Sequence, residues 1–258
     1  QAGNDPLAVI NDPNIDAVLV CTSTDTHATL IEAAAQAGKQ IFCEKPVAMT
    51  LEQTDRAINA AERAGVKLQI GFNRRFDANY ARVRQSAGSG EIGEPQILHI
   101  IRRDPAPPPI AYIKVSGGIF LDMAIHDFDM ARFLTGSEAT EVYVQAGVMV
   151  DPAIGAAGDV DTAVILLRFA NGVIATIDNS RKAVYGYDQR VEFFGSGGVI
   201  NTANNYANTA TLSTADSVRR DLPLNFFMQR YIEAYAAEIE SFVAAVVNNT
   251  PVAVTGQD

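Results

Sequence analysis

The chain has 258 residues, of which 48% are hydrophobic and 19 are glycine, so it can bury one large core or two smaller ones. Its net charge of −10, from 20 basic and 30 acidic residues, comes with no basic run, which argues against binding to nucleic acid or to an anionic membrane surface. The longest apolar runs are too short to cross a bilayer and no charged-then-apolar leader occurs, so we expect a cytoplasmic protein with no membrane span.

The first 71 residues alternate between short apolar runs and helical segments. Polar residues that suit a helix start and glycines that suit a helix end separate these segments. An alternating order of this kind predicts a parallel sheet that helices cover. The predicted strands are Ala17–Cys21, Ile41–Cys43 and Val66–Ile70, and the predicted helices run from about Ala28 to Ala37 and from Thr50 to Gly65.

From residue 72 the pattern changes to long alternating runs, which are typical of an antiparallel sheet with one buried face. Asn171-Gly172 predicts a hairpin turn between two of these runs, and a last helix is predicted near 226–247, packing back on the chain. We therefore expect an α/β domain at 1–71 and an α+β domain at 72–258. The predicted strands of the second domain are Gln96–Arg102, Glu141–Val150, Asp161–Phe169, Val173–Asn179 and Arg190–Phe194.

The segment Gly117–Leu134 is apolar almost all the way round, yet it carries Asp122, His126 and Asp129. At helical spacing these positions are i, i+4 and i+7, so one face of a buried helix would hold all three ionisable groups. Such groups are costly to bury unless they are paired or used, which favours a working site. A hydrogen-bonded core network is the alternative.

A second landmark is the run IFCEKP at Ile41–Pro46, where a strand leads directly into Glu44 and Lys45. Ligands of open parallel sheets bind just outside the carboxyl ends of the strands. Together, the EKP run and the Asp122–His126 helix resemble the Gfo/Idh/MocA family of NAD(P)-dependent sugar and polyol oxidoreductases over nearly the whole chain. The resemblance implies that Lys45, Asp122 and His126 form the catalytic group.

Three further stretches resemble the branch of that family that oxidises myo-inositol to a keto-inositol. They are DPAPPP at Asp104–Pro109, KVSGG at Lys114–Gly118 and YGYDQR at Tyr185–Arg190. The implied reaction is hydride transfer from a secondary alcohol, with His126 as the base and Asp122 orienting its ring. Another inositol isomer or a sugar is the alternative substrate.

The resemblance implies a partial Rossmann-type domain at 1–71 and an open antiparallel sheet domain with helices on one face. A dinucleotide fold also needs a Gly-rich turn and, about 20 residues later, an acidic residue for the ribose. Neither is present, and Gly195–Gly198 reads as a tight turn, so we expect the chain to enter midway through the cofactor domain. NAD is the expected cofactor, with NADP as the alternative, and the implied contacts are Cys21, Thr22, Ser23, His27, Glu44 and Lys45.

A polyol needs several hydrogen-bonding side chains around it. The candidates are Arg74, Asp129, Tyr185 and Tyr187. Arg74 could instead form a salt bridge, and one of the two tyrosines could instead pack against the sheet. Tyr185 and Tyr187 are two residues apart and would face the same side of a strand. For His27 the alternative is a hydrogen bond to its own loop.

Other classes of protein remain open from the sequence. Asp122, His126 and Asp129 have a plausible spacing for metal ligands, but Lys45 would then be unexplained, so no metal site is expected. A noncatalytic sugar or nucleotide sensor of the same fold and an inactive fragment are the remaining alternatives. The family resemblance also implies a homotetramer formed through the antiparallel sheet. We expect Cys21 and Cys43 to be unlinked thiols.

Overall fold

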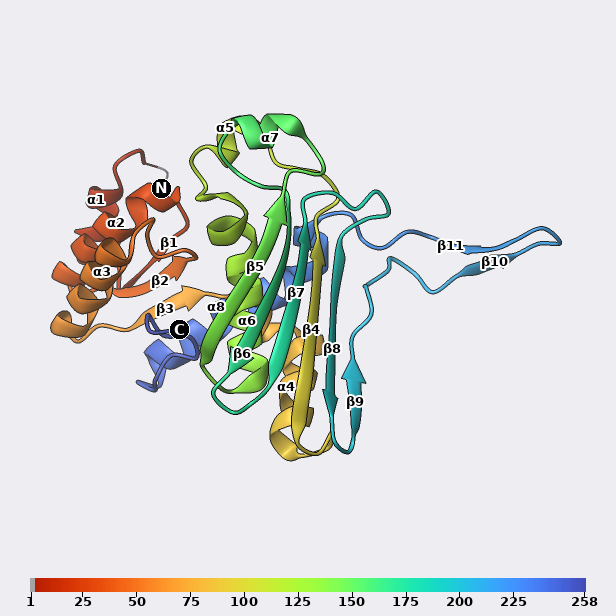
Figure 1. Cartoon of the computed structure of the whole chain (residues 1–258). Helices are drawn as coiled ribbons and strands as arrows, with labels where there is room; N and C mark the ends of the chain where they lie inside the picture. Colours follow the sequence, from red (N-terminus) through yellow and green to blue (C-terminus); the bar gives the residue numbers. More distant parts are fainter. Residues whose placement is uncertain (1–2) are drawn as a thin grey trace. The chain divides into compact units, whose positions relative to one another are not determined.

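A computed structural model describes residues 3–258, and Figure 1 shows the order of its helices and strands. The chain forms two compact units. Unit 1 contains Gln1–Asn73 and Tyr235–Asp258, and unit 2 contains Arg74–Ala234. The chain therefore enters unit 2 once and returns to unit 1 within its last helix.

Unit 1 is built on a three-stranded parallel sheet in the order β1-β2-β3. Val18 pairs with Ile41, and Cys43 pairs with Ile70. The parallel sheet with intervening helices is confirmed, with strand ends within two residues of the predicted ones. Its elements before the boundary are α1 (Pro6–Ile10), β1 (Ala17–Val20), α2 (Thr24–Gln36), β2 (Gln40–Glu44), α3 (Leu51–Ala64) and β3 (Leu68–Gly71).

Local signals fix the helices of unit 1. The Thr50 hydroxyl accepts a hydrogen bond from the Gln53 N–H at 3.3 Å and so starts α3, and Gly65 ends it with a left-handed φ of 66°. Helix α2 begins at Thr24, four residues before the predicted start. Ser23 is extended at its cap position, so the polar stretch that follows forms the first helical turn instead of a loop.

The carboxyl-terminal segment completes the core of unit 1. Helix α8 (Phe227–Val247) continues into this unit from Tyr235 onward. The Phe242 ring lies 6.0 Å from the Phe42 ring between centroids, and the Ile70 N–H donates to the Val254 carbonyl at 3.2 Å. Both contacts join the end of the chain to the parallel sheet.

Unit 2 has a six-stranded sheet in the order β5-β6-β7-β4-β8-β9. Helices α4 and α6 cover one of its faces, as Figure 1 shows. Its helical elements are η1 (Asn73–Phe76, across the boundary), α4 (Ala78–Ser89), α5 (Ile110–Ile113), η2 (Ile119–Ala124), α6 (Ile125–Thr135) and α7 (Pro152–Ala156). Its strands are β4 (Pro95–Arg103), β5 (Ala139–Gly147), β6 (Thr162–Phe169), β7 (Ile174–Ser180), β8 (Asp188–Gly195), β9 (Gly198–Asn201), β10 (Thr211–Ser213) and β11 (Val218–Arg220).

The sheet is antiparallel except where β4 lies beside β7, because these two strands run parallel. Alternation of apolar and polar residues predicts a half-buried strand but carries no information on its direction. The strand order explains the exception. β4 enters between β7 and β8, although α5, α6, β5 and β6 intervene in the chain.

Two predicted turns are confirmed. In the β6–β7 hairpin Gly172 has φ of 90°, and the Phe169 N–H donates to the Val173 carbonyl at 2.9 Å. Gly195 pairs with Gly198 across the β8–β9 turn, and a Cβ on Gly195 would overlap the Ile92 carbonyl oxygen. Glycine is therefore required there for packing, not for phosphate binding.

Strands β10 and β11 form a small hairpin that projects from unit 2 as an arm (Figure 1). All six of its strand residues are exposed. Across residues 3–258, none of the helices is both long enough and apolar enough to cross a membrane.

Candidate active site

The predicted cofactor contacts of unit 1 gather at one edge of its parallel sheet. Cys21, Thr22 and Ser23 follow β1 and are exposed, while Glu44 ends β2 and Lys45 follows it. The amino end of α2 lies in the same loop, and the Ser23 side chain makes no capping hydrogen bond there. Polar groups at the carboxyl ends of parallel strands lie where ligands of open parallel sheets bind.

His27 joins the two loops of this edge. Its Nδ1 lies 2.8 Å from the Pro46 carbonyl oxygen and its Nε2 lies 3.0 Å from the Thr22 carbonyl oxygen. The ring is buried, with 1% of its surface exposed. The alternative role expected for His27 was a hydrogen bond to its own loop, and the contact with Thr22 is such a bond. The histidine therefore fixes the β1–α2 loop against the EKP run.

Glu44 is half-buried against the backbone of the next strand. A Cβ on Gly71 would lie only 2.9 Å from the Glu44 Oε2 atom, so the carboxyl group rests on the space that glycine leaves. Burial raises the pKa of Glu44, and the charge of Lys45 acts in the opposite direction. The Glu-Lys pair of the EKP run is therefore electrostatically coupled at the edge of the sheet.

In unit 2 the predicted single helix over Gly117–Leu134 is wrong in its first part. Residues Ile119–Ala124 form a π-helical segment, and a regular α-helix starts only at Ile125. Gly117 and Gly118 precede it with φ of 85° and 74°. A π-helical turn holds more residues than an α-helical one, so the 3.6-residue rule fails across this junction. The junction lies between Asp122 and His126.

Asp122 is held from two sides. Its Oδ1 accepts the Tyr112 hydroxyl at 2.9 Å, and its Oδ2 lies 3.3 Å from Nη1 of Arg181. Burial, followed by the charge of Asp122, raises the pKa of Tyr112 to about 12, so the phenol stays a donor at neutral pH. A buried arginine and a neutral phenol thus fix this carboxylate.

Arg74 is buried and paired within unit 2. Its Nη1 donates to Asp127 Oδ1 at 2.7 Å, and its Nη2 lies 3.5 Å from the Tyr187 hydroxyl. The other Asp127 oxygen accepts the Asn179 amide at 2.9 Å. Asp127 has no exposed surface, so it is the centre of a fully buried polar network.

Asp129 is held by the neighbouring arginine. Arg75 Nε donates to Asp129 Oδ1 at 2.9 Å, and 1% of the Asp129 side chain is exposed. The structure therefore contains much of the core network that the sequence left as an alternative. It attaches two successive arginines to two aspartates on α6.

The two candidate tyrosines do not share one side of a strand. β8 begins only at Asp188, and Gly186 between them has φ of 122°, which breaks the alternation of a strand. Tyr187 is buried, whereas Tyr185 is 36% exposed and donates to Asp188 Oδ2 at 2.6 Å. The prediction of a common side was wrong because a left-handed glycine turns the chain between them.

Sequence reasoning missed four residues that order this region, namely Arg75, Tyr112, Asp127 and Arg181. Arg75 and Asp127 were visible as charges next to predicted site residues, in RRF and HDFD. Tyr112 and Arg181 carried no such signal, because each reaches Asp122 from a different part of the chain.

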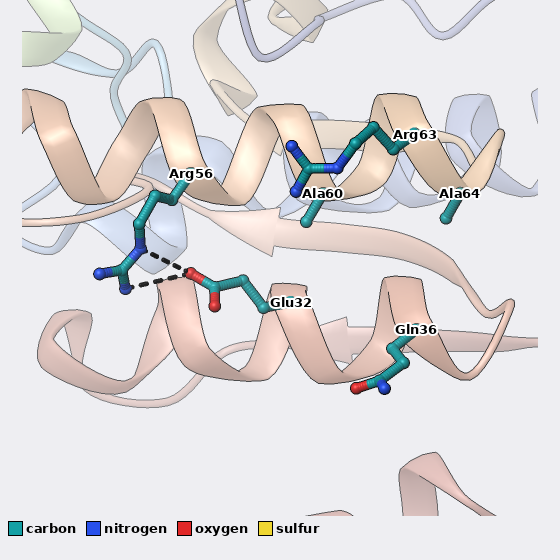
Figure 2. A pocket seen from close by; sticks show the side chains of 6 residues that line it. All are labelled: Glu32, Gln36, Arg56, Ala60, Arg63 and Ala64. Carbon is teal, nitrogen blue, oxygen red and sulfur yellow. Dashed lines mark hydrogen bonds and ion pairs between the residues drawn. The ribbon is translucent and has the colours of Figure 1, made fainter.

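Other features of the surface do not involve the predicted site. A pocket of about 410 Å³ lies between α2 and α3, where Glu32 and Arg56 form an ion pair (Figure 2). Within the described chain, no three His, Cys, Asp or Glu side chains are placed to hold a metal ion. Cys21 and Cys43 are free thiols.

Lys45 belongs to unit 1, whereas Asp122, His126 and the four substrate candidates belong to unit 2. Two family models match separate parts of the chain, and the change from one to the other lies near the same boundary. Residues 2–72 match the model of an oxidoreductase family with an NAD-binding Rossmann fold, and residues 80–201 match the GFO/IDH/MocA C-terminal domain.

Three relatives are similar along almost the whole chain. Myo-inositol 2-dehydrogenase of Thermotoga maritima is 51% identical over 258 residues, which cover 100% of this chain and 77% of the relative. Inositol 2-dehydrogenase of Rhizobium meliloti is 49% identical, over 95% of this chain and 74% of the relative. The crystal structure of scyllo-inositol dehydrogenase from Lactobacillus casei, with bound NAD(H) and scyllo-inositol, matches with a TM-score of 0.90 and 30% identity, over 98% of this chain and 76% of that one.

These matches agree with the parallel sheet of unit 1 and the mixed sheet of unit 2. The chain belongs to the Gfo/Idh/MocA family of NAD-dependent oxidoreductases.

Proposed function

We propose that this protein oxidises myo-inositol to a keto-inositol with NAD as the hydride acceptor. The observation that carries the proposal is the 51% identity, over all 258 residues, with a relative named myo-inositol 2-dehydrogenase. The chain also keeps the lysine, aspartate and histidine that the family resemblance makes catalytic, at Lys45, Asp122 and His126. A noncatalytic sensor would not need this group of side chains.

Oxidation of a secondary alcohol removes a hydride from the carbon and a proton from the hydroxyl oxygen. NAD, when bound, supplies the hydride acceptor. His126 takes the hydroxyl proton, since an imidazole is the side chain best matched to proton transfer near neutral pH. Asp122 orients the imidazole and stabilises its protonated form, and the bonds from Tyr112 and Arg181 keep Asp122 in place for this task.

Lys45 is assigned to the substrate oxygen. As the hydroxyl proton leaves, that oxygen gains negative charge, which an ammonium group stabilises. Lys45 follows β2 directly, at the edge of unit 1 where Cys21, Thr22, Ser23, His27 and Glu44 are the proposed cofactor contacts. His27 supports this assignment by tying the two loops of that edge together.

The polyol hydroxyls are assigned to Arg74, Asp129, Tyr185 and Tyr187 of unit 2. Of these, Tyr185 is the most exposed, at 36%, and its hydroxyl also accepts from Arg103 Nη1 at 3.1 Å. Arg74, Asp129 and Tyr187 are buried, so they would act at the inner end of a substrate site. The Arg74–Asp127 pair keeps the charged guanidinium in that interior.

The test is the absorbance of reduced nicotinamide with myo-inositol and NAD, measured for the full-length protein and for Lys45→Met. We expect turnover by the wild type and a loss of at least about 100-fold in kcat for the variant. Lys67→Met is the matched control, because Lys67 lies in the same unit and donates to the Thr250 carbonyl. Absence of turnover in a folded, full-length wild type would contradict the proposal.

A second candidate is an enzyme of the same family acting on another inositol isomer. The Lactobacillus casei structure, at 30% identity, supports this candidate because its bound substrate is scyllo-inositol. Comparing kcat/KM for myo-inositol, scyllo-inositol and common sugars separates the two candidates, and NADP in place of NAD tests cofactor choice.

We also propose a homotetramer formed through the outer face of the unit 2 sheet. Ile97, Ile174 and Phe194 are cross-strand neighbours on β4, β7 and β8, and each is 38–42% exposed. Tyr143 and Leu166 form a second exposed pair on β5 and β6. Contiguous exposed apolar side chains of this kind are typical of a covered surface. A monomeric mass by light scattering would contradict this proposal.

The proposed location is the cytoplasm, where an NAD-dependent polyol oxidation has both cofactor and substrate. Fractionation of cells with an antibody to the protein tests the location. Recovery in a membrane or an extracellular fraction would exclude it.

A further inference from the structure

A buried arginine that follows the last residue of β7 contacts Asp122. Arg181 is 1% exposed and follows Ser180, the last residue of β7. Its Nη1 lies 3.3 Å from Asp122 Oδ2 and its Nη2 lies 3.5 Å from Asp159 Oδ2. One guanidinium therefore bridges two carboxylates, of which only Asp122 belongs to the proposed catalytic group.

Asp159 is itself fixed in place. Its Oδ1 accepts the Ile119 N–H, at the start of the π-helical segment, at 3.1 Å. Gly118 is needed beside it, because a Cβ there would lie 2.6 Å from Asp159 Oδ1 and the residue has φ of 74°. Asp159 thus anchors both Arg181 and the first turn of the segment that carries Asp122.

We propose that Arg181 is a positioning residue, which fixes the carboxylate of Asp122, four residues before His126, in one orientation and balances part of its negative charge. This inference rests on the proposed function of Asp122 and His126. Arginine suits the role because its planar guanidinium can hold two carboxylates in set directions, which a lysine ammonium cannot do. Tyr112 holds the other Asp122 oxygen, so both oxygens are engaged.

The charge balance around Asp122 gives the proposal a measurable consequence. Without the positive charge of Arg181, the negative charge of Asp122 would act more strongly on His126 and favour its protonated form. Without the negative charge of Asp159, Arg181 would neutralise Asp122 more completely. Tyr112 of α5 and Arg181 after β7 contact Asp122 directly. Asp104 after β4 is close enough for its charge to interact with that of Asp122, and Asp159 before β6 pairs with Arg181.

The experiment follows the titration of His126 by NMR in the full-length protein. The sequence has only three histidines, so His27→Gln and His99→Gln variants assign the imidazole signals. We expect Arg181→Met to raise the titration midpoint of His126 by about one pH unit and Asp159→Asn to lower it. The Asp159→Asn variant keeps a side-chain oxygen for the Ile119 N–H. Arg132→Met is the control, because Arg132 pairs with exposed Glu138 at the end of α6.

Kinetics with inositol and NAD test the positioning. Arg181→Lys keeps the charge but loses the planar bridge, so we expect kcat to fall about tenfold or more while the KM for inositol changes little. Retention of wild-type kcat by this variant would overturn the positioning role. Should Arg181→Met fail to fold, Arg181→Lys and Asp159→Asn still decide the matter.

The outcomes separate the inference from the proposed function. Opposite shifts of the His126 midpoint support the charge balance even if no inositol is oxidised. Unchanged midpoints in folded Arg181→Met and Asp159→Asn proteins would overturn it. If the wild type oxidises inositol and Asp122→Asn does not, unchanged midpoints remove only the role of Arg181.

Discussion

Glu238 on α8 makes the stability of the protein depend on pH in a direction opposite to that of most carboxylates. Its side chain has no exposed surface, and neither carboxyl oxygen has a hydrogen-bond partner among residues 3–258. The Gln69 amide nitrogen donates to the Glu238 backbone carbonyl at 2.9 Å instead. Burial, followed by the charge of Glu44, raises the pKa of Glu238 to about 9.

The magnitude follows from the two pKa values. The folded state binds the Glu238 proton more tightly than the unfolded state, whose pKa is 4.5, so stability falls as pH rises from about 4.5 to about 9. Each pH unit in this window lowers the free energy of unfolding by about 1.4 kcal/mol, so the loss of stability at pH 7 is about 3 kcal/mol. Glu238→Gln removes the ionisation and should remove this cost.

The assay is urea unfolding followed by circular dichroism, for the wild type and Glu238→Gln, at several values between pH 5 and pH 8. The glutamine has its own cost of burial, but that cost does not depend on pH. We therefore expect the unfolding free energy of the variant to gain about 1 kcal/mol or more on that of the wild type for each unit that the pH rises. A difference that stays constant over this range would refute a protonated, buried Glu238.

Three further substitutions test the buried polar contacts. Asp127→Ala leaves the Arg74 guanidinium buried without its carboxylate, so the free energy of unfolding should fall by about 3–5 kcal/mol in urea titrations. A loss below about 1 kcal/mol would show that Arg74 finds water or another partner. Gly71→Ala places a Cβ 2.9 Å from Glu44 Oε2, so we expect weaker NAD binding by calorimetry together with a lower melting temperature, and an unchanged NAD affinity would contradict a role for that carboxylate. Burial raises the pKa of Asp161, but hydrogen bonds from backbone N–H groups outweigh it and hold the pKa below 3.8. That stabilisation is present above the unfolded pKa and is lost as pH falls through the folded pKa. We therefore expect Asp161→Asn to be less stable than the wild type at pH 7, with a difference in unfolding free energy that shrinks in acid. A difference that does not depend on pH would refute this role of Asp161.

Most of the fold follows from local signals in the sequence. The apolar runs of unit 1 predict its three strands because both faces of a parallel sheet are buried, and Thr50 and Gly65 delimit α3 by capping. The parallel pairing of β4 with β7 could not be predicted. It depends on the order of the strands in the sheet, and the alternation of apolar and polar residues within a strand does not indicate that order.

Some features of the candidate site could also be predicted from the sequence, and others could not. The EKP run and the Asp122–His126 spacing were visible, because each lies within a few consecutive residues. The π-helical turn was not visible, because the 3.6-residue spacing rule assumes a regular α-helix. The contacts of Tyr112 and Arg181 with Asp122 were not visible either, because they join different elements of the fold. Tyr185 and Tyr187 show the limit of pattern rules, since one glycine with φ of 122° cancels the alternation.

The central claim is that the full-length protein oxidises myo-inositol with the proton of its hydroxyl group passing to His126. The most direct measurement is the rate of NAD reduction with myo-inositol for the wild type and for His126→Gln, from about pH 6 to pH 10. We predict wild-type activity that rises through the titration of one group, and a loss of at least about 100-fold in the variant. Turnover by His126→Gln at the wild-type rate and with the wild-type pH profile would contradict the account.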